Sequence, residues 1–139
     1  IIKTLKPYHT SFQVSKLRPG TAYKFKICSY KRIDGKIYEG KVSTLTARTK
    51  VSAVKLKVKT KGKIIKLSWK KVRGAKGYEI YISSKKNGKY KKIASNKKTG
   101  YDYVIKKGGK FYIKVRAYSS SGSKKIYGAY SKVFKVAVK

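Results

Sequence analysis

The chain matches itself when it is shifted by 88 positions. Residues 17–30 align without a gap on residues 105–118, and Gly40 then falls on Gly128. A repeat of this length is a whole small domain used twice, because the units of solenoid proteins are only about 20–50 residues long. The sequence therefore predicts two related units within 139 residues.

The first of the two units lacks its beginning. Upstream of residue 17 the match continues through only a few positions, with Ile2 and Leu5 falling on Tyr90 and Ile93, and, after a shift of one residue, Phe12 and Val14 falling on Tyr101 and Tyr103. Residues 51–139 are predicted to form a complete unit, and residues 1–50 only the later part of another. We therefore expect the sequence to be a piece of a longer polypeptide.

Apolar and polar residues alternate in short segments, and helical periodicity is missing. The alternating segments of the complete unit are residues 54–58, 65–69, 78–82, 101–105 and 111–117, with a short strand near 90–93 and a last strand within 129–138. Asn87-Gly88 predicts a tight hairpin, because these residues tolerate the positive φ angles of a type I′ turn. Seven short strands at this spacing predict an all-β fold, an antiparallel β-sandwich.

The complete unit resembles a fibronectin type III domain. Trp69 ends the second strand as the core tryptophan of that family does, and residues 78–82 are similar to its third strand. In the first unit, residues 17–23 resemble the family's tyrosine corner, which ends in Tyr23; Phe111 takes that place in the second unit and cannot make the hydroxyl bond. The resemblance implies an immunoglobulin-like β-sandwich, with one complete module preceded by the C-terminal half of another.

Two lysine-rich segments indicate which kind of fibronectin type III domain the unit resembles. Residues 69–78 and 127–131 are similar to fibronectin type III modules of secreted and wall-associated proteins in Gram-positive bacteria. Such modules follow enzymatic or adhesive domains as accessory repeats. The resemblance thus implies an extracellular location, at the cell wall or cell surface.

The incomplete unit has no counterpart of residues 54–82. Its inward side chains are expected to face water at a cost of about 1.5–3 kcal/mol each; they include Phe12, Val14, Tyr23, Phe25 and Ile27. We therefore predict that a missing upstream segment or another chain covers residues 1–50, or that this half is loosely ordered. The join at residues 49–52 contains neither Gly nor Pro, which favours a stiff tandem.

Charge indicates the class of partner. The sequence has 39 basic and 4 acidic residues, a formal net charge of +35. Only five of the basic residues are arginines, and lysine acts as a point charge rather than as the planar fork that reads bases. We expect diffuse attraction to an anionic cell-wall polymer or polysaccharide, with non-specific binding of nucleic acid as the alternative. No apolar run is long enough to span a membrane.

Catalysis is not expected. The four acidic residues are Asp34, Glu39, Glu79 and Asp102, and the last two are predicted to point outward from different strands, so no carboxylate pair forms for glycoside hydrolysis. His9 is the only histidine and lies in the incomplete first unit, so neither a Ser-His-Asp triad nor a histidine metal cluster is expected. Cys28, predicted to lie on the outward side of its strand, is the only cysteine, so an intrachain disulfide is excluded. Neither a cofactor nor a metal is expected.

An outward stripe is the candidate ligand-binding surface. Its members share one strand parity or lie on the neighbouring strand; they are Tyr81, Tyr112, Lys114, Arg116 and Tyr118. Aromatic rings interleaved with cations can stack on sugar rings or bases while holding anionic groups. The structural alternative is that strand tyrosines pack over cationic stems as cross-strand pairs. The sequence thus predicts a non-catalytic accessory or spacer module, or alternatively a carbohydrate- or nucleic-acid-binding one.

Overall fold

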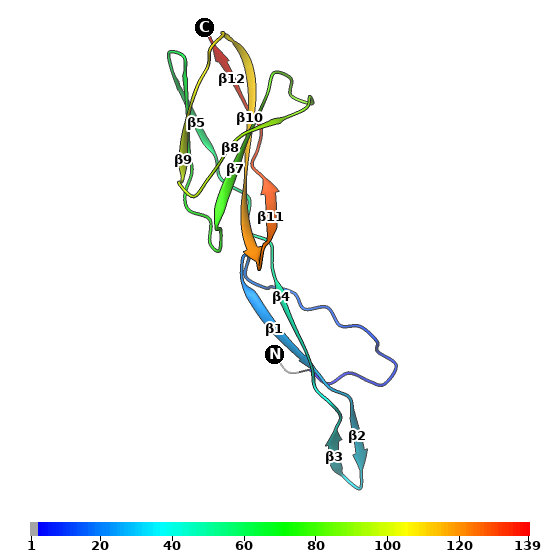
Figure 1. Ribbon diagram of the computed structural model, residues 1–139. Helices are drawn as coiled ribbons and strands as arrows, with labels where there is room; N and C mark the ends of the chain where they lie inside the picture. Colours follow the sequence, from blue (N-terminus) through cyan, green and yellow to red (C-terminus); the bar gives the residue numbers. More distant parts are fainter. Residues whose placement is uncertain (1–2) are drawn as a thin grey trace.

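The computed structural model describes residues 3–139, all of which are strand, turn or irregular backbone (Figure 1). Within this range there are twelve strands: β1 (Ala22–Ile27), β2 (Tyr30–Ile33), β3 (Lys36–Glu39), β4 (Ser43–Arg48), β5 (Lys57–Lys61), β6 (Ile64–Ser68), β7 (Gly77–Ser83), β8 (Lys91–Asn96), β9 (Gly100–Val104), β10 (Gly109–Ser121), β11 (Lys124–Tyr130) and β12 (Phe134–Val138). The predicted all-β class is confirmed.

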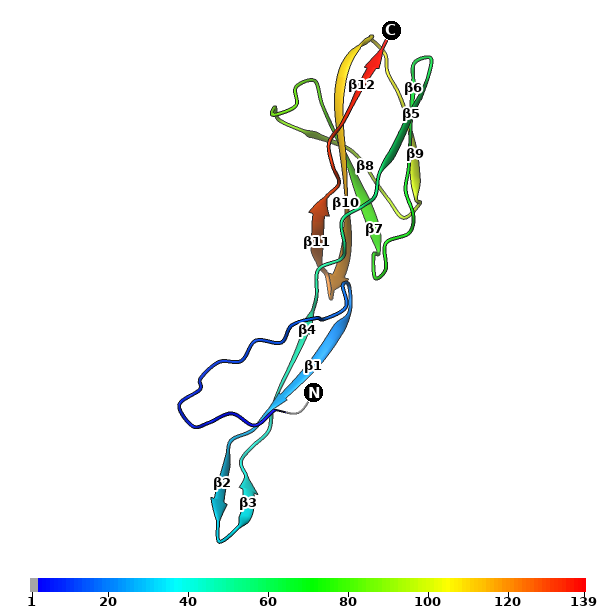
Figure 2. The same ribbon diagram turned by 180° about the vertical axis from the view of Figure 1, so that it is seen from behind.

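Strands β5 to β12 form two facing antiparallel sheets (Figures 1 and 2). One sheet has the order β5-β6-β9. The other has the order β8-β7-β10, and the long strand β10 pairs with β12 along its first half and with β11 along its second half. This arrangement is the antiparallel β-sandwich that the spacing of the alternating segments predicts.

The core of the sandwich lies between these two sheets. Ile65 of one sheet and Ile80, Ile113 and Val115 of the other are completely buried. Trp69 follows β6 and is 6% exposed, and its ring meets that of Tyr78 edge-on with 5.2 Å between the centroids. The prediction that Trp69 is a core residue is confirmed.

Two predictions for the complete unit need correction. Its first strand, β5, was expected at residues 54–58 but begins only at Lys57, although Val54 and Leu56 are buried core residues. The turn at Asn87-Gly88 is not type I′, because neither residue has a positive φ. The β7–β8 connection runs over residues 84–90, too long for a two-residue turn, and it is closed by the Tyr90 hydroxyl, which donates a hydrogen bond to the Lys86 carbonyl at 2.9 Å.

Residues 129–138, expected to contain the last strand, hold the end of β11 and the whole of β12. Between β11 and β12, Ser131 exchanges hydrogen bonds with Val115: its amide donates to the Val115 carbonyl at 2.7 Å, and its hydroxyl accepts from the Val115 amide at 3.0 Å. Val133 follows and is 40% exposed. This interruption explains why residues 129–138 show no simple alternation of apolar and polar residues.

Residues 22–48, which we call the first hairpin, repeat the arrangement of β10, β11 and β12. The 88-residue shift places β1 and β2 on the two halves of β10, β3 on β11, and β4 against β12. The counterpart of the continuous strand β10 is broken at Cys28 and Ser29. Cys28 therefore lies after β1 and not on the outward side of a strand, which corrects the prediction.

A tyrosine corner is present at the base of the first hairpin, as the resemblance implied. The Tyr23 hydroxyl accepts a hydrogen bond from the Arg18 amide at 2.8 Å. Nearby, the Thr49 hydroxyl donates to the Arg18 carbonyl at 2.7 Å. These bonds tie the start of β1 to the segment that follows β4.

Replacing Tyr23 by Phe should destabilise this corner by about 1 kcal/mol, because the Arg18 amide loses its acceptor while the ring stays in place. Hydrogen exchange of the Arg18 amide should become about five times faster. Tyr38→Phe is the matched control, since Tyr38 is 54% exposed on β3. Equal exchange rates in the two variants would show that the corner bond contributes nothing.

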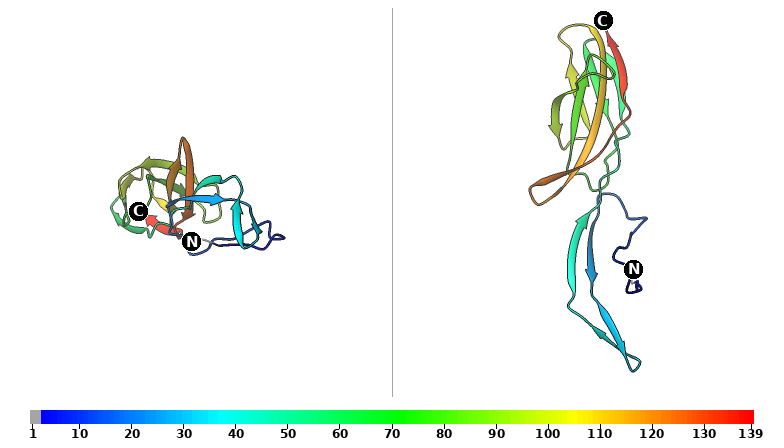
Figure 3. Two further views of the ribbon diagram at one scale, coloured as in Figure 1. Left: turned by 90° about the horizontal axis from the view of Figure 1, so that it is seen from below. Right: turned by 90° about the vertical axis from the view of Figure 1, so that its right-hand side faces the viewer.

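The corner also contacts the sandwich, at the point where the hairpin meets one of its ends (Figure 3). Gly20 is buried with φ +65°, and a Cβ added there would lie 2.7 Å from the carbonyl oxygen of Arg73. A Cβ added to Gly74 would lie 2.5 Å from the Gly20 oxygen. Val51, in the connecting segment, is 3% exposed and packs beside Gly128. Close backbone contact of this kind requires glycine on both sides.

Candidate functional site

The candidate stripe lies on the outer face of the sheet that contains β7 and β10. Lys114 is paired with Tyr81, Arg116 with Glu79, and Tyr118 with Gly77. Tyr112, Lys114, Arg116 and Tyr118 are all half-buried and point to the same face, as their parity predicts. The alternation of side chains along each strand therefore correctly predicted that these residues share one face with Tyr81 of the neighbouring strand β7.

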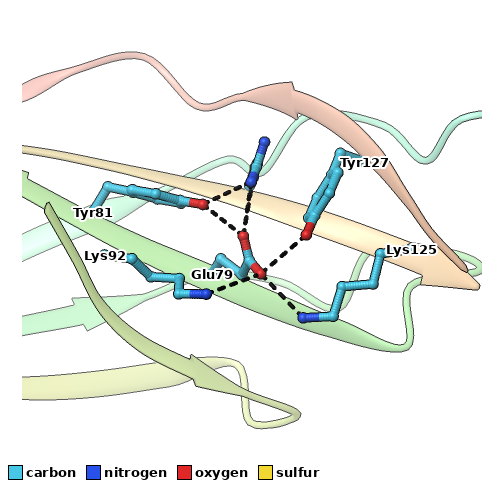
Figure 4. Close-up of polar contacts among 6 residues, drawn as sticks. Glu79, Tyr81, Lys92, Lys125 and Tyr127 are labelled. Atoms are coloured by element: carbon cyan, nitrogen blue, oxygen red, sulfur yellow. Dashed lines mark hydrogen bonds and ion pairs between the residues drawn. The ribbon is translucent and has the colours of Figure 1, made fainter. Parts of the chain in front are cut away.

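A buried carboxylate is the centre of this face. Glu79 is on the outward side of β7, as predicted, but it is only 1% exposed, because side chains from β7, β8, β10 and β11 cover it (Figure 4). Its Oε2 accepts from Tyr81 Oη at 2.6 Å and from Arg116 Nη2 at 2.9 Å and Nε at 3.2 Å. The predicted outward position of Glu79 is confirmed, and its burial on that face was not predicted.

The other carboxylate oxygen of Glu79 binds residues that the sequence reasoning missed. Its Oε1 accepts from Lys125 Nζ at 3.1 Å and from Tyr127 Oη at 3.3 Å, and Lys92 Nζ lies 3.7 Å away. Lys125 and Tyr127 belong to β11, and Lys92 to β8. The register of these two strands was not predictable from alternation, so no signal in the sequence pointed to them.

Most tyrosine rings of this face lie against cations of the same chain. The Arg116 guanidinium carbon is 3.6 Å from the Tyr127 ring centroid and 5.0 Å from that of Tyr130. Lys114 Nζ lies 4.0 Å from the Tyr90 centroid and 4.2 Å from the Tyr130 centroid. Contacts of this kind are attractive because the ring face is electronegative. These rings and cations therefore stabilise one another across strands.

The members of the candidate stripe differ in how far they are engaged. Tyr81 donates to Glu79 and meets Tyr130 edge-on, with ring centroids 5.4 Å apart. The Tyr118 ring has Lys125 Nζ at 4.3 Å from its centroid. Tyr112 is half-buried on the outer face opposite Ser83. A role of the stripe in ligand binding stays a prediction.

Glu79 is held in its charged form. Burial acts to raise the pKa of this carboxyl, but hydrogen bonds from Tyr81, Arg116 and Lys125 outweigh burial and lower the pKa to about 2. The hydrogen bond to Glu79 also raises the pKa of the Lys125 ammonium. Burial and the neighbouring carboxylate raise the pKa of Tyr81. At neutral pH the cluster therefore contains one anion surrounded by Arg116, Lys125 and Lys92.

This arrangement predicts a loss of stability in acid. The pKa of Glu79 is about 2 in the folded chain and 4.5 in its ordinary state, so the unfolded chain takes up the proton first as pH falls. The contribution is complete above about pH 4.5 and disappears as pH falls towards 2, a change on the order of 3 kcal/mol in the free energy of unfolding. Urea unfolding between pH 5 and pH 2 measures it. A Glu79→Gln variant should lose this component of the pH dependence. If the free energy of unfolding changed with pH identically in the variant and the unaltered chain, Glu79 would not be the group responsible.

The other acidic residues form no catalytic arrangement. Asp102 makes an exposed ion pair with Lys66 at 3.0 Å, and Asp34 occupies a turn with φ +48°. His9 is exposed in an irregular segment. No group of three or more His, Cys, Asp or Glu side chains that could hold a metal occurs within residues 3–139. None of these residues lies in a helix, so they contain no helical membrane span.

The surface grooves of the sandwich include one of about 640 Å³ and one of about 670 Å³. The smaller is lined by Ser84 and residues 103–111, which include Lys106, Lys107 and Lys110 but no carboxylate. The other is lined by Leu67, Asn96 and residues 98–102, which include Asp102. The first groove therefore offers the more cationic surface.

Comparison with known proteins supports the fold. No protein-family model and no curated protein matches the chain. Among solved structures, domains d3–d4 of the rat CD45 extracellular region match with a TM-score of 0.59 and 16% identity, covering 99% of this chain and 74% of that one. The FN1–FN3 domains of chicken CNTN1 match with a TM-score of 0.53 and 17% identity, and the match covers 92% of this chain and 46% of that one.

A smaller protein matches the chain in part. A mutant of FN3tt has a TM-score of 0.51 and 21% identity, and the match covers 62% of this chain and 93% of that one. Identities this low show the fold alone. Together with the sheet order, they show that the chain has the antiparallel β-sandwich fold of fibronectin type III domains.

Proposed function

We propose that the chain is a non-catalytic accessory and spacer module of a larger secreted or cell-surface bacterial protein, and that its lysines attract anionic cell-wall polymers. The observation that carries this proposal is the unneutralised positive charge, formally +35. Every lysine among residues 3–139 except Lys114 is exposed. Of the few acids, Glu79 is enclosed by its own cations and Asp102 is paired with Lys66. Little on the surface therefore opposes the approach of a polyanion.

The spacer part of the proposal is supported by the packed joint. Gly20 and Gly74 bring two backbones together, and Val51 is buried between the hairpin and the sandwich. A packed connection of this kind limits bending more than a Gly- or Ser-rich linker does. We propose residues 1–50 and 51–139 as consecutive modules of a stiff tandem. The extracellular, wall-proximal location is proposed from the lysine-rich resemblance and fits the match to the extracellular region of CD45.

Retention on isolated Gram-positive cell walls tests the attraction. The chain should bind at low salt and elute progressively as salt rises, because the ions screen exposed charges within about 10 Å at 0.1 M. A neutral polymer such as dextran serves as the control matrix and should retain nothing. Binding that persists unchanged at molar salt, or that is missing at low salt, would count against the proposal.

The alternative function, recognition of a carbohydrate or nucleic acid by the outer sheet face, is favoured by Lys114. This lysine lies between two tyrosine rings, and within residues 3–139 it pairs with no carboxylate. If the surface recognises a carbohydrate, binding should survive high salt and weaken when Tyr112 is replaced by Ala. If it binds nucleic acid, affinity should fall steeply as salt rises, and a defined oligonucleotide should outcompete the wall polymer at physiological salt. The matched control is Tyr38→Ala, which removes an exposed tyrosine from β3.

A further inference from the structure

The first hairpin has an open backbone edge where its counterpart is paired. Residues 112–115 of β10 pair with β7 on one edge and partly with β12 on the other. The matching residues 24–27 of β1 pair with β4 only, within the part of the chain that the structure describes. An unpaired edge presents free amide and carbonyl groups that can accept another strand.

The same hairpin exposes an apolar face. Phe25 is paired with Leu45 and Tyr23 with Ala47, so the four side chains lie on one face of the β1–β4 ladder. Ile27 is 72% exposed and Leu45 64% exposed. In the complete unit the residues matching Phe25 and Ile27 are Ile113 and Val115, and both are completely buried. The first hairpin therefore has the apolar side chains of a core face, but no second sheet within residues 3–139 covers them.

Residues 3–16, which precede the first hairpin, also lack the strand pairing of the residues that they match in the second unit. Residues 3–16 match the region of β8 and β9, yet they contain no strand and loop away from β1 and β4 (Figures 1 and 2). The reason lies in the topology, because β8 pairs only with β7, and β9 only with β6. Because residues 3–139 contain one copy each of β6 and β7, and both belong to the second unit, residues 3–16 have no sheet to join there.

We infer that the open edge and apolar face of the first hairpin accept strands equivalent to β5, β6 and β7, supplied by the same polypeptide upstream of residue 1. In the second unit, β5, β6 and β7 directly precede the region of β8 and β9 that residues 3–16 match. The entering strand resembles β7: it places apolar residues opposite Phe25 and Ile27, as Ile82 and Ile80 lie opposite Ile113 and Val115.

Charge disfavours a second copy of the chain as the occupant. Lys24 and Lys26 alternate with the apolar residues of β1 and point to its other face. Two copies joined edge to edge through β1 would bring these lysines together, and like charges on paired strands are destabilising. A β7-like strand avoids this repulsion, because β7 contains no basic residue.

A graft tests the inference. Residues 1–16 are replaced by a copy of residues 51–104, which then precedes Leu17 as Val104 precedes Ile105 in the second unit. Hydrogen exchange of the β1 amides should slow by about 100-fold or more, because they join a cooperatively folded sheet. The control graft carries Lys in place of the copied Ile80. Equal exchange in the unaltered chain and the graft, or equal protection by both grafts, would overturn the inference.

Two further measurements keep the test decisive if the graft does not fold. A peptide of residues 76–85, added to the unaltered chain, should slow exchange of the β1 amides more than the same peptide with Ile80 and Ile82 replaced by Lys. No difference between the peptides would overturn the inference. The unaltered chain should sediment as a monomer, and a dimer that protects the β1 amides would assign the face to a second copy instead.

Discussion

Replacing Glu79 by Gln is expected to destabilise the sandwich by about 3–5 kcal/mol, because it removes a buried anion and leaves the half-buried Arg116 guanidinium and two exposed lysines without their partner. The carboxylate is 1% exposed and makes hydrogen bonds or ion pairs with five side chains, namely Tyr81, Lys92, Arg116, Lys125 and Tyr127. These side chains come from four strands of one sheet. Loss of the charge therefore weakens the contacts between all of them.

Urea unfolding at neutral pH measures this effect. Asp102→Asn is the matched control, because Asp102 is 54% exposed in its ion pair with Lys66 and should contribute less than about 1 kcal/mol. If Glu79→Gln and Asp102→Asn shift the midpoint equally, the buried cluster is not a stabilising element. A Glu79→Gln chain as stable as the unaltered one would have the same meaning.

The second large effect is expected for Trp69→Ala, at about 3–5 kcal/mol. Trp69 lies between the two sheets and meets Tyr78, whose hydroxyl accepts from the Val72 amide at 3.0 Å. Truncation leaves a cavity that the surrounding isoleucines and valines cannot close. Trp69 Nε1 is buried and has no hydrogen-bond partner among residues 3–139, so almost all of the loss comes from packing.

An exposed apolar residue provides the control for Trp69. Val104 is 63% exposed at the end of β9, so Val104→Ala should change the free energy of unfolding by less than about 0.5 kcal/mol. Unfolding of both variants is best followed by far-ultraviolet circular dichroism, since Trp69→Ala removes the only tryptophan. Similar midpoints for the two variants would contradict the packing of Trp69.

Most of the sandwich could be predicted from the sequence because its strands keep one face in the core. Residues 65–69, 78–82 and 111–117 alternate as two-faced strands must, and all three lie in or next to the strands observed. The β7–β8 loop and the break between β11 and β12 could not be predicted. The break between β11 and β12 depends on tertiary hydrogen bonds between Ser131 and Val115, which leave no local pattern. The β7–β8 loop is instead closed by a local bond from Tyr90 to Lys86, which the Asn87-Gly88 pair does not indicate.

The outer face of the sheet that contains β7 and β10 could be predicted only in part. Parity correctly grouped Tyr81 with Lys114 and Arg116, because side chains two residues apart on paired strands share a face. It could not show that Glu79 is buried, since Tyr127 and Lys125 of β11 and Lys92 of β8 help to cover it and the register of these strands was not predicted. Cross-strand pairing of tyrosines with cations, the structural alternative, describes the observed contacts of Arg116, while ligand binding by the stripe stays a prediction.

Quenching of the emission of Trp69 by acrylamide tests the central claim, that the single tryptophan is sealed between two sheets while the lysines face solvent. Acrylamide is uncharged, so the positive surface neither attracts nor repels it. The account predicts weak quenching in the folded chain and strong quenching only after unfolding in urea. Quenching of the folded chain as strong as that of the unfolded chain would contradict it.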